Sequence, residues 1–473
     1  MDSKTSEIKT FSSDEHEEWI QSTGYILFSM GSSSFRCGYA CNEYPMFIIP
    51  CIVGRPKYEA VLPPCLQIGV QIGDEAQRHR SVLHLVSPIQ HGLVTDWDAC
   101  EKIWRHSIDR EIRGRHLPDR CVVIMVTVPP LQPKAQQQKL RRLLFEKFQF
   151  PHVVFKEESE LILLASGKTT GIVVSSGSGV TFVAPFYQGY SLQQGVRRLD
   201  VGGDDLTTYL ERLLSPKYPD VHHNTNLVEK IKHQMCYVNR LPLLVPMEMS
   251  FETRIKSFKV GTFLFTMPDG NVLRMSQSDC SQCGEAVFHP SLMGADFPGL
   301  HQLIDASIRT CDLEIWSELF GAVILAGGNT VMKGLGDRLV QELEKLAPQG
   351  VRVAVVGLDH PGFKKASVWV GGAISAKQGG LYGRLDRKDG KEEWEKEQDR
   401  QSIAQEKELQ ATVVVGCMVR RVGGGIGFKL PLFLLRHVWE FIHVCPERYL
   451  RTGEMVGEHS WWGSCLKAHI HNL

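Results

Sequence analysis

Two stretches of the chain share one pattern of apolar runs around a short turn rich in serine and glycine. The first runs from residue 24 to 28, turns at 31–34 and returns over 35–40. The second runs from 170 to 174, turns at 175–179 and returns over 180–185. Both read as β-hairpins, and the repeated design predicts two related lobes.

The segments around the second hairpin alternate between helical periodicity and strand-like apolar runs. Helical spacing covers residues 98–111, 136–148, 206–214 and 226–238; strand-like runs cover 121–128 and a hairpin at 263–275 that turns at Pro268-Asp269-Gly270. This alternation predicts a mixed α/β core.

A third glycine turn follows a buried apolar run. Residues 321–326 predict a strand, Gly327-Gly328-Asn329 a turn, and 332–346 a helix. A strand, a glycine turn and a helix N-terminus present backbone N–H groups to an anion. Three such turns suggest a phosphate clamp between two lobes, whereas any single one is an ordinary tight turn.

Charge and hydropathy exclude several classes of protein. The 53 basic and 53 acidic residues cancel, so no overall field attracts nucleic acid or an anionic membrane. The first twenty residues lack the apolar region of a signal peptide, and residues 430–444 are too short and too charged to span a bilayer. From about residue 386 to 408 charges dominate, which is typical of a solvated linker.

The thirteen cysteines are scattered rather than densely spaced, which favours a reducing compartment. Cys280 and Cys283 form a CxxC pair. A structural zinc site would need a second pair or matching histidines, which the neighbouring sequence lacks.

Several longer strings carry a family resemblance. They are Ile52-Val53-Gly54-Arg55-Pro56, Ile72-Gly73-Asp74-Glu75-Ala76-Gln77, Pro88-Ile89-Gln90-His91-Gly92, Asp96-Trp97-Asp98, Glu101-Lys102-Ile103-Trp104, residues 165–173, Arg198-Leu199-Asp200, Cys236-Tyr237-Val238, Pro268-Asp269-Gly270 and residues 367–372. In this order they resemble actin from about residue 24 to 374. The resemblance implies the fold that actins share with chaperone ATPases and sugar kinases: two lobes and four subdomains around a nucleotide cleft.

That resemblance divides the chain as follows. Residues 1–21 are an N-terminal extension that we expect to be flexible, 22–165 the first lobe with a small subdomain at 51–88, and 166–374 the second lobe with a small subdomain at 202–285. Residues 375–473 form a tail that does not resemble actin, either folded or the product of an alternative transcript.

At the metal positions of actins, this chain has serine. Ser29, Ser175 and Ser178 stand where actins have aspartates that orient the hydrated magnesium ion. Serine supplies no negative charge to that shell. The resemblance therefore predicts no metal site and degenerate metal positions.

The other nucleotide positions match in part. The resemblance assigns to phosphate or nucleoside contact Gly31, Ser32, Arg36 (in place of lysine), Gly177, Gly179, Lys232, Gly327, Gly328 and Lys365. Asp204, His233, Asn329 and Met332 depart from the family pattern. Weak binding of ATP or ADP and a cleft without any ligand both remain open.

The positions that orient the attacking water in actins are Glu158 and Phe182 here. A phenyl ring neither donates nor accepts the required hydrogen bond. We therefore expect no catalytic residues and no ATPase activity, with Glu158 and Phe182 as degenerate positions.

The resemblance implies a cytoplasmic, cytoskeletal structural or scaffold protein, closest to the male-germ-cell actin-like group. Its expected partners are cytoskeletal or other actin-binding proteins, with no nucleic acid and no membrane; self-assembly remains open. The alternative is a slow, ATP-binding, polymerising actin-related protein. A sugar-kinase-like or chaperone-like ATPase is disfavoured by the strings at Asp96-Trp97 and Ser367-Val368-Trp369.

Overall fold

The computed structural model describes residues 25–40, 42, 44–57, 69–109, 123–222, 224–240, 262–267, 269–358, 360–378 and 384–386. All of them belong to the first of two compact units, residues 1–390; the second spans 391–473. The predicted N-terminal extension, Gly24, Pro268, the charged linker and most of the tail lie outside the described residues.

The described strands are β1 (Tyr25–Met30), β2 (Ser34–Tyr39), β3 (Phe47–Pro50), β4 (Val53–Pro56), β5 (Gln71–Ile72), β6 (Leu83–Val86), β7 (Ile89–Gln90), β8 (Leu93–Val94), β9 (Val123–Val128), β10 (His152–Glu157), β11 (Gly171–Ser176), β12 (Thr181–Tyr187), β13 (Tyr190–Ser191), β14 (Arg197–Leu199), β15 (Thr262–Thr266), β16 (Val272–Ser276), β17 (Val323–Ala326) and β18 (Arg384–Asp386). The described helices are α2 (Asp74–Arg78), α3 (Trp97–Ser107), α4 (Lys134–Arg142), α5 (Glu158–Ser166), α6 (Gly203–Leu214), α7 (Thr225–Met235), α9 (Gln277–Glu285), α10 (Leu300–Arg309), α11 (Trp316–Phe320), α12 (Leu335–Leu346) and α13 (Pro361–Lys377).

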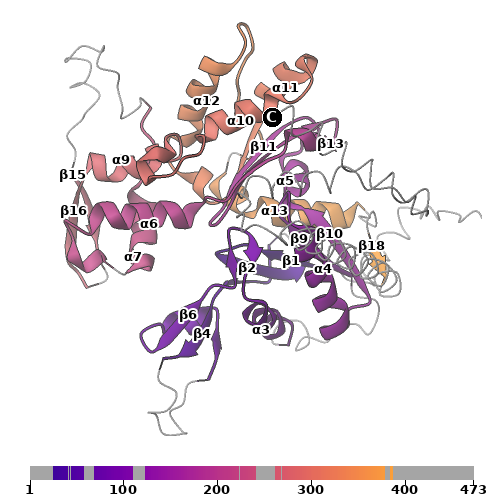
Figure 1. The fold of residues 1–473 in the computed structure, drawn as a ribbon, viewed down its shortest axis with the longest axis vertical. Helices are drawn as coiled ribbons and strands as arrows, with labels where there is room; N and C mark the ends of the chain where they lie inside the picture. Colours follow the sequence, from indigo (N-terminus) through magenta and orange to yellow (C-terminus); the bar gives the residue numbers. More distant parts are fainter. Residues whose placement is uncertain are drawn as a thin grey trace, which may run out of the picture. The chain divides into compact units, whose positions relative to one another are not determined.

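The first predicted hairpin, β1–β2, lies inside a six-stranded sheet in the order β18-β10-β9-β1-β2-β3 (Figure 1). β1 pairs antiparallel with β2 and parallel with β9. Asp96 caps α3 by accepting from Ala99 N (3.0 Å), and this helix packs on one face of the sheet.

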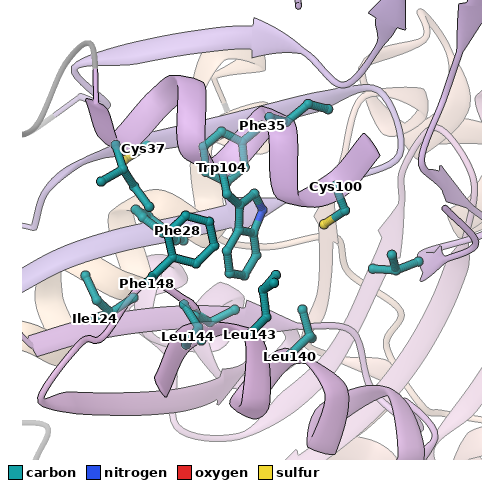
Figure 2. Packing of buried hydrophobic residues seen from close by; sticks show 14 of the residues in the cluster. Phe28, Phe35, Cys37, Cys100, Trp104, Ile124, Leu140, Leu143, Leu144 and Phe148 are labelled. Carbon is teal, nitrogen blue, oxygen red and sulfur yellow. The ribbon is translucent and has the colours of Figure 1, made fainter. Parts of the chain in front are cut away.

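Aromatic residues fill the core between that face and helices α3 and α4. Figure 2 shows Trp104 of α3 among Phe28, Phe35 and Phe148. The Phe28 and Trp104 ring centroids are 5.4 Å apart in an edge-to-face arrangement. Burying each such side chain stabilises the fold by about 2–3 kcal/mol.

The second predicted hairpin, β11–β12, anchors a sheet in the order β13-β12-β11-β17, with β14 also paired to β12. Its strands are buried on both faces, as their near-continuous apolar sequences predict. One face packs against α10, α11 and α12. The α/β prediction is thus confirmed.

Helices α5 and α13 pack together and contact strands of both sheets. Trp369 of α13 is fully buried against Leu27 and Met125 of the first sheet. Ile162 and Leu163 of α5 pack on Val173 and Phe182 of the second. A Cβ on Gly371 would lie 1.8 Å from the Leu161 carbonyl oxygen, so only glycine allows these helices to approach so closely.

Two smaller units complete the described fold. Strands β5, β4 and β6 form a three-stranded sheet with α2, and the β15–β16 hairpin packs with α6, α7 and α9 (Figure 1). Among the described residues, no helix combines the length and apolar character needed to cross a membrane.

One local prediction differs from the structure. The helix predicted to follow Gly327-Gly328-Asn329 begins later, at Leu335, because a 3-10 turn and Gly334 (φ 81°) intervene. In addition, the tail contributes β18, which pairs antiparallel with β10 and extends the first sheet.

Candidate functional site

The two hairpin turns lie against each other through a short loop between β7 and β8. Ser32 Oγ of the first hairpin accepts a hydrogen bond from Gly92 N (3.1 Å). His91 Nδ1 donates to Gly179 O of the second hairpin (2.9 Å). A Cβ on Gly179 would lie 2.5 Å from Ser32 Oγ, so glycine is required for this approach.

Arg198 holds the same loop from β14, and its side chain is only 10% exposed. It donates to His91 O (2.6 Å) and Pro130 O (3.4 Å). These contacts surround His91, whose φ of 47° is uncommon for a residue other than glycine. Sequence reasoning missed this role, although Arg198 lies in one of the strings that resemble actin.

The N-terminus of α6 faces the second hairpin. Gly203 N and Asp204 N donate to Gly177 O and Ser178 O, both at 2.9 Å. Ser178 Oγ donates to Asp204 Oδ1 at 2.5 Å. Burial raises the pKa of Asp204, and the hydrogen bond from Ser178 opposes that shift. The hydroxyl at one degenerate metal position is therefore already bound by a carboxylate of the protein.

The glycine turn after β17 packs on the end of β11. Asn329 Nδ2 donates to Gly177 O (2.7 Å) and to Ser176 Oγ (3.0 Å). Gly327 has a φ of 89°, and a Cβ there would lie 2.3 Å from Ser176 O. At Gly328 a Cβ would meet nothing within 4 Å, so no close approach requires glycine at that position.

Lys232 is buried, with 5% of its surface exposed. Its ammonium donates to Gly203 O (2.6 Å) and Thr207 Oγ1 (2.8 Å) on α6. Burial lowers the pKa of Lys232. This predicted nucleotide contact therefore acts within the protein, as a link between α7 and α6.

Arg36 joins the first hairpin to α13. Its guanidinium donates to Lys365 O (2.8 Å), while the Lys365 side chain is exposed. Burial lowers the pKa of Arg36, and the charge of Glu158 opposes that shift. Burial also raises the pKa of Glu158 to about 7, although the charge of Arg36 acts in the opposite direction.

The remaining degenerate positions lie at strand ends. In β1, Ser29 is two residues after Leu27, so the two side chains lie on the same face of the first sheet. Leu27 packs with Trp369, so this is the face that α13 covers. Ser175 pairs directly with Phe182 across the second hairpin. The Phe182 ring is 1% exposed and packs with Ile162 and Val173, so that position belongs to the hydrophobic core.

The donor set does not fit a hydrated magnesium ion. Ser29, Ser175 and Ser178 offer only hydroxyls, and the Asp204 carboxylate already accepts a hydrogen bond from Ser178. Within the part of the chain that the structure describes, no group of three or more His, Cys, Asp or Glu residues could hold a metal ion.

The nucleoside positions carry a different chemistry from the one expected for the family. His233 Nε2 lies 3.5 Å from Glu229 Oε1 on α7, and the hydrogen bond between them lowers the pKa of Glu229. Met332 packs against apolar residues of two core clusters.

Comparison with known proteins agrees with this architecture. The family model described as Actin matches residues 20–383. An actin-like protein of Neurospora crassa is 36% identical over 355 residues, covering 74% of this chain and 90% of that protein. With its two hairpin-centred sheets and mixed α/β topology, the chain belongs to the actin family and has the actin-like fold.

Proposed function

We propose that this chain is a structural or scaffold protein of the cytoskeleton that does not hydrolyse ATP. The observation that carries the proposal is the set of serines at the metal positions, one of which, Ser178, is bonded to Asp204. Phosphoryl transfer depends on charge stabilisation and on a positioned water. Three hydroxyls and the buried ring of Phe182 supply neither.

Glu158 does not restore the reaction. Its raised pKa makes it a usable base near neutral pH, but a base without a metal or a second group to position water recovers little rate. Arg36, the other charged candidate, donates to Lys365 O and thereby supports the contact between hairpin and helix.

The test uses the purified full-length chain with fluorescent ATP, in magnesium and in EDTA, together with phosphate release. We expect no release above the buffer rate, and binding that EDTA leaves unchanged. Tight, magnesium-dependent binding with phosphate release would contradict the proposal. ATP-dependent pelleting would instead favour the slow, polymerising alternative.

A gain-of-function variant tests the role of the serines directly. The variant combines Ser29→Asp, Ser175→Asp and Ser178→Asp with Asp204→Arg, because an aspartate at 178 would otherwise face the Asp204 carboxylate. We expect magnesium-dependent nucleotide binding to appear. Ser81→Asp, at an exposed position in the turn before β6, is the control and should leave binding unchanged.

A further inference from the structure

Three thiols lie together in the core formed by α6, α7, α9 and the β15–β16 hairpin. Cys236 follows the last residue of α7, and Cys280 and Cys283 belong to α9; all three are free and buried. The thiols of Cys236 and Cys283 are near enough to interact directly.

Backbone contacts fix the two segments that carry these thiols. Tyr237 N donates to Cys280 O (3.3 Å). A Cβ on Gly284 would lie 2.4 Å from Tyr237 O, so glycine allows the end of α7 to pack on α9. The residues next to Cys236 and Cys283 are therefore in contact.

A buried cation lies beside the pair. Cys283 Sγ donates to Leu206 O (3.7 Å), and Lys232 donates to Gly203 O and Thr207 Oγ1. Positions 203, 206 and 207 share one face of α6, so the ammonium and the thiol meet the same helical turn. A hydrogen bond from Cys236 lowers the pKa of the Cys283 thiol. Burial opposes that shift, and the positive charge of Lys232 adds to it.

We propose that Cys236 and Cys283 are a redox-active dithiol that a small hydroperoxide converts to a disulfide bond between α7 and α9. Independently of the proposed scaffold function, this assigns a modification site to the second lobe. Cys283 is the attacking sulfur, because its thiol contacts the same turn of α6 as the ammonium. Cys280, whose pKa burial raises to about 11, stays a thiol.

The chemistry balances with hydrogen peroxide as the oxidant. The Cys283 thiolate attacks one peroxide oxygen, the O–O bond breaks, and the sulfenic acid and hydroxide result. Cys236 then attacks the Cys283 sulfur, and its proton leaves with the displaced hydroxyl as one water. The proton that Cys283 lost on becoming a thiolate combines with the hydroxide to give the second water. Two thiols and one peroxide give one disulfide and two waters. Because both sulfurs are buried, peroxide reaches them only after local opening, and the observed rate is the open fraction multiplied by the rate at which the Cys283 thiolate reacts.

The experiment treats the native full-length chain with hydrogen peroxide, alkylates the remaining thiols after denaturation, and maps disulfides by mass spectrometry. We expect a Cys236–Cys283 link that dithiothreitol reverses. Cys51 and Cys100, equally buried but without a neighbouring ammonium, are an internal control and should stay alkylatable.

Two variants test the assignment within the cluster. Cys280→Ser should leave the yield of the link unchanged, and Lys232→Met, of similar length but uncharged, should slow its formation by about tenfold. The proposal is overturned if Cys236 and Cys283 stay reduced at a peroxide concentration that oxidises other thiols of the chain, or if the link forms at Cys280 instead.

Discussion

The contact between α13 and α5 yields a quantitative prediction for Gly371→Ala. The new Cβ would lie 1.8 Å from the Leu161 carbonyl oxygen, whereas a carbon–oxygen contact needs about 3.3 Å. The neighbour is backbone and cannot rotate away. Relief therefore requires α13 to move by about 1.5 Å, which disturbs the packing of the buried Trp369 against the first sheet.

Two opposing effects set the size of the change. Alanine in place of glycine favours a helix by about 1 kcal/mol. Inserting an extra methyl group into a packed interior usually lowers the free energy of unfolding by up to about 3 kcal/mol. We take this upper value because the backbone itself must move. We therefore expect a net loss of about 2 kcal/mol, or about 4 °C in the thermal midpoint at roughly 2 °C per kcal/mol for a large unit.

Thermal unfolding of the full chain, followed by circular dichroism, measures this loss. Gly336→Ala is a matched control on α12, since its Cβ would meet only Leu325 Cδ1 at an ordinary 3.9 Å. The control should match or exceed the wild-type midpoint. If the thermal midpoint of Gly371→Ala is as high as that of Gly336→Ala, the close approach of α13 and α5 does not require glycine at position 371.

Two further predictions concern buried charges. Arg338→Met removes the guanidinium that lies 3.1 Å from the Glu285 carboxylate, where both side chains are fully buried, and leaves that carboxylate beside the His289 ring (3.4 Å). It should cost about 3–5 kcal/mol in urea unfolding. Lys102→Ala, at a pair whose side chains are 38% and 65% exposed, is the control and should cost under about 1 kcal/mol. The pKa of Glu158 is about 7 in the folded state, against 4.5 for an unperturbed glutamate. Between these two pH values the folded state holds a proton that the unfolded state has lost, so the free energy of unfolding falls as the pH rises from 4.5 through 7, by up to about 3 kcal/mol. Glu158→Gln should remove that part of the pH dependence and be more stable than wild type at pH 8; an unchanged pH profile would show that the carboxylate is not held in a buried setting.

The hairpins could be predicted from the sequence because their register follows from local features. A glycine- and serine-rich turn between two apolar runs leaves few ways to pair the strands. β18 could not be predicted in this way, since its three residues lie in a charged region and pair with the edge of β10 rather than by a pattern of their own. Likewise, the start of α12 depends on the left-handed backbone of Gly334, which periodicity does not reveal.

The site shows the same division between local and distant causes. The resemblance predicts Ser178 as a degenerate metal position and Lys232 as a nucleotide contact, but each has a partner that is distant in sequence. Ser178 is bonded to Asp204, and Lys232 is bonded to Gly203. Such pairs depend on how α6 and α7 pack on the hairpin, and no spacing in the sequence encodes that arrangement.

Two glycines of the predicted phosphate turns, Gly179 and Gly327, have a structural explanation that needs no ligand. Gly179 allows Ser32 and His91 to approach, and the Gly177 carbonyl accepts from both Gly203 and Asn329. Losing either turn would disturb the packing of both lobes whether or not a nucleotide binds. The resemblance assigns the carboxylates of actins at positions 29, 175 and 178 to the ligand, and the proposed function expects serine there to leave this packing intact. If selection on hydrolysis has ceased while selection on the fold continues, the glycine turns are expected to persist and the carboxylates to be replaced. This is the pattern that the chain has.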